Sequence, residues 1–499
     1  MYIFISEEFS NIESMVIYME EMKRGLKTRH ISMIAIGGSI GTGLFMASGA
    51  VITQAGPAGA LVAYSIIGVM LYFLMTAIGE LATFYPVSGS FSAYSSRFID
   101  PSAGFTVGWL YWIIWALVTS VDILTAAKII TYWDVFQNIN PFVWSIIFLV
   151  ILFLLNAFTV KAFGEAEYWL SFIKVATIII FLIVGVLIIF GILGGNEPLG
   201  LTNFTYKDAP FVNGMSGFLG VLLVAGFSFG GTEVVAVTAG ESENPKESMP
   251  KAIRQVFWRI LLFYILAIAV IAAIIPYTDP LLLNKSNTVT QSPFTIVFDR
   301  VGIAFAASII NAVILTALIS AGNSGLYATS RLLYSLAQHK QAPKFINKLN
   351  KNNMPFISLC VTIVLIFLSI IYATINTDGY YRLLNMLGAL VTLVWLMSII
   401  SHIRLRMAIK KQGQSTTDTL EYKAPLYPLG PIIVIAVIAF LLIGQSFDSI
   451  MTLNYPVLIE SFLPIILGIV VYFVHKITTK SKIIKLKDID LSKHQYNNK

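Results

Sequence analysis

Two short runs of glycine and hydroxyl residues stand in the middle of long apolar stretches, GGSIGTG at 37–43 and GFSFGGT at 226–232. Glycine destabilises a helix interior, and glycine together with hydroxyl side chains lets a chain unwind where it lines a cavity within a membrane. Breaks here would expose free N–H groups at the start of the outer half of the first helix and free carbonyls at the end of the first half of the second. An α-amino acid, with a carboxylate and an ammonium on one carbon, would satisfy both. A smaller organic ion with both charges also fits.

The same two runs permit a second interpretation. Gly37 with Gly41, and Gly226 with Gly230, fit the G-x-x-x-G spacing that is common where two membrane helices pack closely. Paired interruptions in corresponding segments are, by contrast, the sequence pattern of an inverted-repeat transporter. Because the runs lie in the first and sixth apolar segments, each of which begins a set of five, we expect helix breaks at both.

Ionisable side chains inside membrane spans are costly and are functional candidates for that reason. Glu233 lies just beyond the second run, where its carboxylate could exchange a proton or attract a cationic substrate. A neutral, hydrogen-bonded structural acid is the alternative. Glu80 is expected to tie helices to the following loop, and Asp122 stays ambiguous. Glu241 and Asp279 could guide a cationic substrate, although a helix-end charge explains the first as well and an Asp-Pro turn is favoured for the second.

The elements that must position these residues are apolar helices. The chain of 499 residues is 57% hydrophobic and only 12% charged, which excludes a soluble enzyme core and a disordered chain. Apolar runs of about 18 residues or more are long enough to span a membrane. Twelve such segments are predicted, at 31–52, 58–82, 102–132, 141–160, 168–193, 213–240, 254–276, 294–336, 356–374, 381–404, 431–449 and 456–476.

The basic residues indicate an orientation. Most of the 33 Lys and Arg fall in the tails and in the loops on the same side as the tails. The loops on the other side hold only Lys207, Lys285, Arg300 and Arg382. Because basic loops stay cytoplasmic, we expect both termini in the cytoplasm. This asymmetry also accounts for the net charge of +7 without a nucleic acid partner.

Several kinds of chemistry are excluded by what the sequence lacks. Cys360 is the single cysteine, so neither an internal disulfide nor a cysteine metal site can form. All five histidines fall in tails or at cytoplasmic ends of spans, which leaves no histidine relay or metal cluster in the membrane. Met46 occupies the third glycine place of a dinucleotide motif, and no phosphate-binding loop follows. We therefore expect no cofactor, no metal and no enzyme activity, and an ion gradient as the energy source.

The longest motifs resemble a known family. They read TRHISMIAIGGSIGTGLF at 28–45, FGEAEYW at 163–169, GFSFGGTEVVAVTAGESENP at 226–245 and SAGNSGLYATSRLLYSLA at 320–337. The chain resembles the amino acid permeases of the amino acid, polyamine and organocation superfamily, from about 26 to 475. The narrower runs QVFWRILLFYILA at 255–267 and IPYTDP at 275–280 are similar to bacterial lysine-specific permeases.

The resemblance implies a fold and a set of site residues. The fold would be all-α and LeuT-like, with twelve transmembrane helices: two inverted five-helix repeats with helices 1 and 6 broken, plus two further helices. Lys174 would stand where sodium-coupled relatives hold an ion and proton-coupled relatives carry a lysine, or would reach the cytoplasmic interface instead. Phe227 would be an aromatic gate. The implied contacts are Ser39, Gly41, Thr42 and Gly43 for the substrate carboxylate, and carbonyls near Ile36, Phe227 and Gly230 for its ammonium.

The sequence thus predicts a secondary transporter in the cytoplasmic membrane of a bacterium, which takes up an L-amino acid, foremost lysine, with a proton. The alternatives are an exchanger, a permease for arginine, histidine or a neutral amino acid, and a membrane sensor that would need a regulatory partner. The expected divisions are a cytoplasmic tail (1–30), two repeats (31–193 and 194–404), helices 11 and 12 (405–476) and a solvated tail near anionic lipid (477–499).

Overall fold

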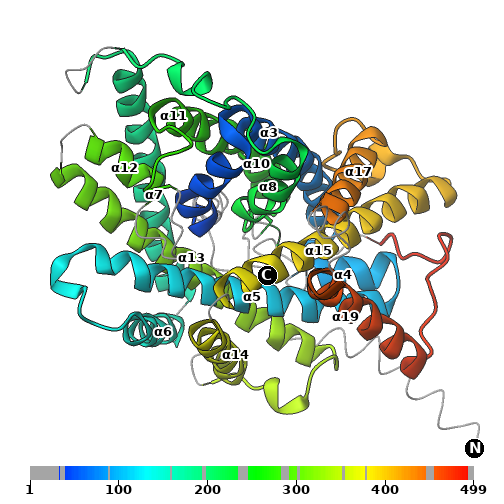
Figure 1. Ribbon diagram of the computed structural model, residues 1–499. Coiled ribbons are helices and arrows are strands. Elements are labelled where there is room, and N and C mark those ends of the chain that lie inside the picture. Colours follow the sequence, from blue (N-terminus) through cyan, green and yellow to red (C-terminus); the bar gives the residue numbers. More distant parts are fainter. Residues whose placement is uncertain are drawn as a thin grey trace, which may run out of the picture.

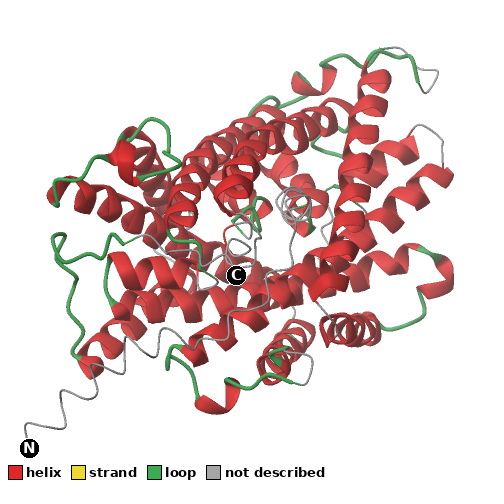
Figure 2. Ribbon diagram, turned by 180° about the vertical axis from the view of Figure 1, so that it is seen from behind, coloured by secondary structure: helices red, strands yellow, loops and turns green. Residues whose placement is uncertain are grey.

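The computed structural model describes residue 33 and residues 40–87, 90–157, 160–193, 198–233, 236, 245–282, 292–300, 304–350, 354–376, 379–444 and 455–492. Within these ranges all regular secondary structure is helical (Figure 2). Seven helices in the described part are long and apolar enough to cross a membrane, and four shorter helices are also apolar. The chain is therefore an all-helical protein with several membrane-spanning segments.

Most of the described helices overlap predicted apolar segments. The long ones are α3 (Ser48–Phe84), α5 (Pro101–Ile129), α7 (Val160–Ile189), α13 (Ala304–Gln338), α14 (Phe356–Ile375), α15 (Gly379–Lys411) and α19 (Tyr455–Thr479). The shorter ones are α4 (Ser90–Phe98), α6 (Pro141–Ala157), α8 (Gly214–Ser228), α10 (Pro245–Arg259), α11 (Ala267–Ile274), α12 (Pro293–Arg300), α16 (Thr416–Thr419) and α17 (Leu429–Gly444). Two single stretches are π-helical, η2 (Gly43–Ala47) and η7 (Ile260–Leu266). Short 3-10 turns lie at η3 (Ile130–Tyr132), η4 (Asp134–Phe136), η5 (Thr202–Phe204) and η8 (Lys344–Ile346).

Helix α3 contains a sharp turn that divides two predicted segments. Gly56 has φ 77° and ψ 172°, which is not a helical conformation, and Pro57 follows it. A Cβ at Gly56 would lie 2.7 Å from the Pro210 carbonyl oxygen, so glycine is required both by the backbone and by the space. The chain turns here from the segment that includes η2 into the next one.

Most of the long and shorter helices form two groups. On one side α5, α6, α13 and α14 pack against one another. On the other side α3 packs against α8, α10, α11 and α17. Helix α15 touches members of both groups and α7 joins α13 to α11, so these two helices bridge the groups (Figure 1).

The C-terminal segment after α19 lies against the protein. The Ile484 amide donates to the Ile99 carbonyl at 2.9 Å, and the Gln412 side chain donates to the carbonyls of Leu486 (3.1 Å) and Ile489 (2.8 Å). Ile489 is only 3% exposed. The expectation of a solvated tail is thus corrected for residues 480–492: Ile484, Leu486 and Ile489 are at least partly buried, whereas Ile483, Asp488 and lysines such as Lys487 are exposed.

Candidate functional site

The second glycine run ends a helix. Helix α8 ends at Ser228, and residues 229–233 form successive turns. Gly231 has φ 92°, in the region that favours glycine. The Gly230 amide donates to the Phe227 carbonyl at 2.9 Å, so that carbonyl keeps only its second lone pair for a ligand.

The first run is described from Ile40 onward. Ile40 is not helical, Gly41 forms a bend, and helical structure starts at Thr42 and continues as η2. A helix therefore begins inside this run, with its first amides at the predicted place. Ile36 and Ser39, two of the predicted contacts, lie outside the described residues.

The two runs meet at Gly43. A Cβ built on Gly43 would lie 2.3 Å from the Cα of Ser228, which leaves no room for a side chain. The Ser228 hydroxyl contacts the Gly43 carbonyl (2.9 Å) and the hydroxyl of Tyr64 (2.8 Å). Tyr64, Phe229 and Tyr264 form an aromatic cluster around this point, with Phe229 and Tyr264 ring centroids 4.0 Å apart. The start of η2 and the end of α8 are thus held in direct contact.

Close helix packing, the alternative interpretation of the G-x-x-x-G spacing, applies to one run and not to the other. A Cβ at Gly41 would lie 3.3 Å from the Cβ of Ala321 on α13, so Gly41 packs closely against that helix. A Cβ at Gly226 would meet nothing within 4 Å, and one at Gly230 would meet only the Phe227 carbonyl of its own turn. Close helix packing therefore contributes to the first run but does not explain the second.

A cavity lies where the runs meet α5, α13 and α15, and it gathers six of the predicted residues. Its lining is Gly41, Thr42, Gly43, Ile114, Trp115, Val118, Asp122, Phe227, Ser228, Gly230, Gly231, Glu233, Ala321 and Val391. Backbone from two interrupted helices, an aromatic pair and two carboxyl groups thus face one space. This arrangement can hold a small molecule that carries both charges.

Asp122, which the sequence left ambiguous, belongs to this lining. Its Oδ1 accepts the Thr42 hydroxyl proton at 2.7 Å, so it fixes the beginning of the helix in the first run. Its Oδ2 has no hydrogen-bond partner among the described residues. Asp122 is 3% exposed, and a buried carboxylate with a free oxygen is available to a ligand or a proton.

Lys174 is fully buried and does not reach an interface. Its ammonium lies 3.9 Å from the Glu167 Oε1, which also accepts the Ser320 hydroxyl proton at 2.7 Å. Lys174 and Asp122 also interact electrostatically. Lys174 thus stays inside the helix bundle beside Glu167 on its own helix α7, and Glu167 in turn contacts α13 through Ser320. The snorkelling alternative is wrong because the Lys174 side chain is only 1% exposed.

Glu233 and Arg259 are two buried charged residues, of which the sequence analysis singled out only the first. Glu233 is 2% exposed, and its Oε2 has no hydrogen-bond partner in the described part of the chain. Arg259, at the end of α10, is also 2% exposed and interacts electrostatically with Glu233. Arg259 was not predicted, because a cation six residues into an apolar segment is indistinguishable from an interfacial one. Arg259 directly precedes the π-helical stretch η7, which contains Tyr264. Such stretches frequently occur at functional positions.

The other charged candidates lie elsewhere. Asp279 forms an ion pair with Arg300, and its Oδ1 accepts the Leu281 amide proton at 2.8 Å, which is the predicted Asp-Pro turn. Glu80 accepts two hydrogen bonds from Arg406 and one from the Ala424 amide, so it ties α3 to α15 and to the segment before α17. None of these three hydrogen bonds comes from the described part of the loop that follows α3, which was the expected partner. Glu241 lies outside the described residues.

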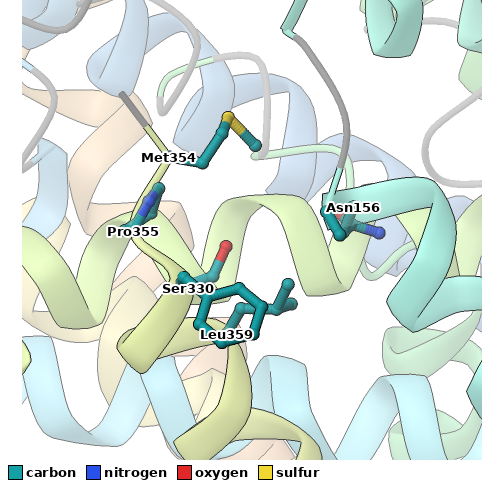
Figure 3. A pocket seen from close by; sticks show the side chains of 7 residues that line it. Asn156, Ser330, Met354, Pro355 and Leu359 are labelled. Carbon is teal, nitrogen blue, oxygen red and sulfur yellow. The ribbon is translucent and has the colours of Figure 1, made fainter. Parts of the chain in front are cut away.

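A second pocket, between α6, α13 and α14, holds none of the predicted residues (Figure 3). Its only polar side chains are Asn156, which donates to Asn323 Oδ1 at 2.7 Å, and Ser330, which donates to the Tyr327 carbonyl at 3.0 Å. It carries no charge complementary to an ionic ligand. As for metals, the described residues contain no group of three or more His, Cys, Asp or Glu that could hold an ion.

Comparison with known proteins identifies the family. The family described as "Amino acid permease" matches residues 30–488. The histidine permease HisP of Lactococcus lactis subsp. cremoris is 48% identical over 95% of this chain and 99% of its own length. The lysine-specific permease LysP of the same organism is 46% identical over 99% and 97%, and that of Escherichia coli is 45% identical over 94% and 96%.

Proposed function

Because the chain belongs to the amino acid permease family, we propose that it takes up L-lysine together with a proton across the cytoplasmic membrane by alternating access. Membership of this family makes the protein a multi-pass membrane transporter of amino acids and not an enzyme. What we propose beyond family membership is that the amino acid is lysine, that a proton moves with it, and that transport is inward.

The observation that carries the proposal is the composition of the cavity. Amides at the start of the helix in the first run can receive an α-carboxylate. The Thr42 hydroxyl can join them only in a state where it no longer donates to Asp122. Carbonyls at the end of α8 can receive an α-ammonium. Asp122 and Glu233 each keep one carboxyl oxygen without a hydrogen-bond partner among the described residues, which suits a substrate with a second ammonium. Phe227 would cover the bound molecule as a gate.

The names of the relatives support a substrate with a basic or imidazole side chain. Two of them are named for lysine and one for histidine, at nearly equal identity. Lysine is preferred here because histidine is mostly uncharged at neutral pH and would leave the carboxylates without a counter-charge. Uptake of histidine is the second candidate, and the same assay separates the two.

The proposed architecture has twelve spans in two inverted repeats (31–193 and 194–404) and two further helices (405–476). The interruptions in the first and sixth segments then occupy equivalent places, which is the arrangement found in inverted-repeat transporters that work by alternating access. The tails (1–30 and 477–499) are proposed to lie in the cytoplasm of a bacterium, because the positive charges gather there.

The proposed proton carriers are Lys174 and Glu233. Both are buried. The Lys174 ammonium lies 3.9 Å from the Glu167 carboxylate, with which it can exchange a proton. Glu233 lines the cavity and keeps one carboxyl oxygen without a hydrogen-bond partner among the described residues, and this oxygen can take up a proton. Glu241 and Asp279 are kept as candidates for cation guidance, Asp279 only in a state where Arg300 releases it.

Purified protein in liposomes tests the proposal. Labelled lysine should accumulate under an imposed inward proton gradient without internal amino acid, and competition with each of the twenty amino acids should rank lysine first. Lys174→Ala should abolish gradient-driven accumulation and spare lysine binding, whereas Lys128→Ala, which removes the other lysine within a span, should retain both. Histidine ranking first would replace lysine, a need for internal amino acid would indicate an exchanger, and binding without flux would indicate a sensor.

A further inference from the structure

The Asp122 carboxyl lies against the backbone at which the helix of the first run begins. Its Oδ1 accepts the Thr42 hydroxyl proton at 2.7 Å, and the same oxygen would lie 3.7 Å from a Cβ built on Gly41. Its Oδ2 has no hydrogen-bond partner among the described residues, although Asp122 is only 3% exposed. Asp122 lines the cavity together with Gly41, Thr42 and Gly43. A carboxyl group of the protein thus stands beside the place where the α-carboxylate of a substrate is proposed to bind.

The Thr42 hydroxyl can serve only one of these two carboxylates at a time. A threonine hydroxyl has a single proton to donate, and in this structure it donates to Asp122. If it turns to a substrate carboxylate, Asp122 loses that hydrogen bond in a buried place where an unpaired charge is costly. Two negative charges this close also repel each other strongly where water is excluded. A proton on Asp122 removes both costs, because a protonated carboxyl is neutral and can itself donate to the substrate carboxylate.

The other charged groups around Asp122 are present with or without a substrate. Glu233 lines the same cavity, and Lys174 on α7 acts electrostatically on Asp122. Arg331 on α13 and Arg382 on α15 lie at least nine positions from the lining residues of their helices, roughly 13 Å along the axis. Helices α6 and α14 carry no charged residue, and α4 and α19 contact α5 about three turns or more before Asp122. What a substrate adds at the helix start is therefore a carboxylate that competes for the Thr42 hydroxyl.

We propose that Asp122 takes up a proton when the α-carboxylate of the substrate binds, and that the Thr42 hydroxyl links the two events by changing its acceptor from Asp122 to that carboxylate. The inference rests on the proposed function and deepens it, because it assigns the step that ties the proton to the substrate. The proton comes from water on the side to which the cavity is open and forms an O–H bond on Asp122. Lys174 and Glu233 take it over when the substrate leaves, so one proton still enters with each lysine. The carbonyl oxygen left on Asp122 can still accept a hydrogen bond from a substrate ammonium.

The number of protons bound with each lysine tests this step. Isothermal titration of the purified protein with L-lysine, repeated in buffers that differ in ionisation enthalpy, measures that number. Between about pH 5.5 and 8.5 the unmodified protein should reach an uptake of nearly one proton, and its affinity should there fall by about tenfold per pH unit. No proton uptake at any pH in this range would overturn the proposal without any variant.

Asp122→Asn replaces the carboxyl by a neutral group of the same shape, which can donate to the substrate carboxylate as protonated Asp122 does. It should bind lysine with proton uptake lower by about one, and its affinity should lose the pH dependence of the unmodified protein. Unchanged proton uptake would place the proton on another group and overturn the proposal. Loss of lysine binding at every pH in a folded variant would also overturn it, because the ionised Asp122 would then hold a substrate ammonium.

Thr42→Val tests the role of the hydroxyl. Without this donor Asp122 holds its proton before the substrate arrives, so proton uptake on binding should fall by about half or more, and Thr42→Ser should recover most of it. Ser120→Ala is the matched control. It removes a buried hydroxyl of the same helix that donates to the Ala116 carbonyl at 2.8 Å and lies outside the cavity lining, and it should take up as many protons as the unmodified protein. Full uptake in Thr42→Val would contradict the link.

Thermal unfolding of each purified variant establishes that it is folded before proton uptake is compared. If Asp122→Asn does not fold, the unmodified protein and Thr42→Val decide the outcome. Absence of lysine binding by the unmodified protein would refute the proposed function. Lysine binding without proton uptake would refute only the inference about Asp122.

Discussion

Gly43 and Gly226, one from each glycine run, differ sharply in the space around them. Gly43 lies against the backbone of Ser228, where any side chain would collide with main-chain atoms that cannot move away alone. Gly226, two residues before the end of α8, has nothing within 4 Å of the position of a Cβ. The contact at Gly43 holds together the helix start and the helix end that face the cavity.

We therefore expect Gly43→Ala to reduce substrate affinity by more than tenfold, because a Cβ at 2.3 Å from Ser228 Cα must push η2 away from α8. The larger Gly43→Leu should act in the same way, through this displacement and not only by filling the cavity. Gly226→Ala is the control and should bind as the unmodified protein does. Isothermal titration with lysine measures both, and unchanged affinity in Gly43→Ala would show that the two helix ends need not touch.

At this scale the sequence identifies residues whose type conflicts with their element. The glycine runs were found because glycine is unsuited to the middle of a helix, and six of the predicted residues line one cavity. The sequence did not reveal that Asp122 lines the cavity or that Arg259 is buried, and the reason is different. Whether a charge within a span faces the cavity depends on how the helix is rotated, and a uniformly apolar helix carries no periodic pattern that reveals its rotation.

In the C-terminal segment, residues 480–492, the sequence analysis relied only on the lysines and so missed the contacts that hold the segment in place. Arg404 on α15 donates to the carbonyls of Phe98, at the end of α4, and Ile484, in the segment. Arg97 on α4 donates to the carbonyls of Asp490 (3.0 Å) and Ser492 (2.7 Å). The segment therefore joins α4 to α15, two helices far apart in the chain.

Asp100 adds a connection between α5 and α19. Although burial opposes its ionisation, hydrogen bonds from Lys476, the Ala103 amide and Tyr472 hold the pKa of its carboxyl below the usual range. This support is present at neutral pH and is lost only as the pH falls through the lowered pKa. Both ends of the segment are thus fixed at physiological pH.

Arg404→Ala should lower the melting temperature of the purified protein by roughly 2 °C or more, because two charge-assisted hydrogen bonds to the backbone are lost. Lys487→Ala, which removes an exposed lysine of the same segment, should leave the melting temperature unchanged. Differential scanning fluorimetry of the two variants decides the matter. Equal melting temperatures in Arg404→Ala and the unmodified protein would mean that the segment adds no stability.

For the whole molecule, the cavity lies where the two groups of helices meet. Its lining comes from α5 and α13 of one group, from α8 of the other and from η2, which packs on α3 and α8. Motion of one group relative to the other would change access to the cavity without unfolding either. Hydropathy predicts the helices but not this grouping, because packing between apolar helices depends on side-chain shape more than on hydrophobicity.

The orientation of the whole molecule is tested with its single cysteine removed. In a Cys360→Ser background, Lys207→Cys places a thiol in the exposed segment before α8, and Lys487→Cys places one in the exposed C-terminal segment. The predicted spans between these positions are odd in number, so the two thiols should lie on opposite sides of the membrane. A membrane-impermeant maleimide should label Lys207→Cys in intact cells and Lys487→Cys only after permeabilisation, since the positive charges place the tail inside. The reverse pattern would invert the topology, and labelling of both thiols in intact cells would contradict the predicted number of spans.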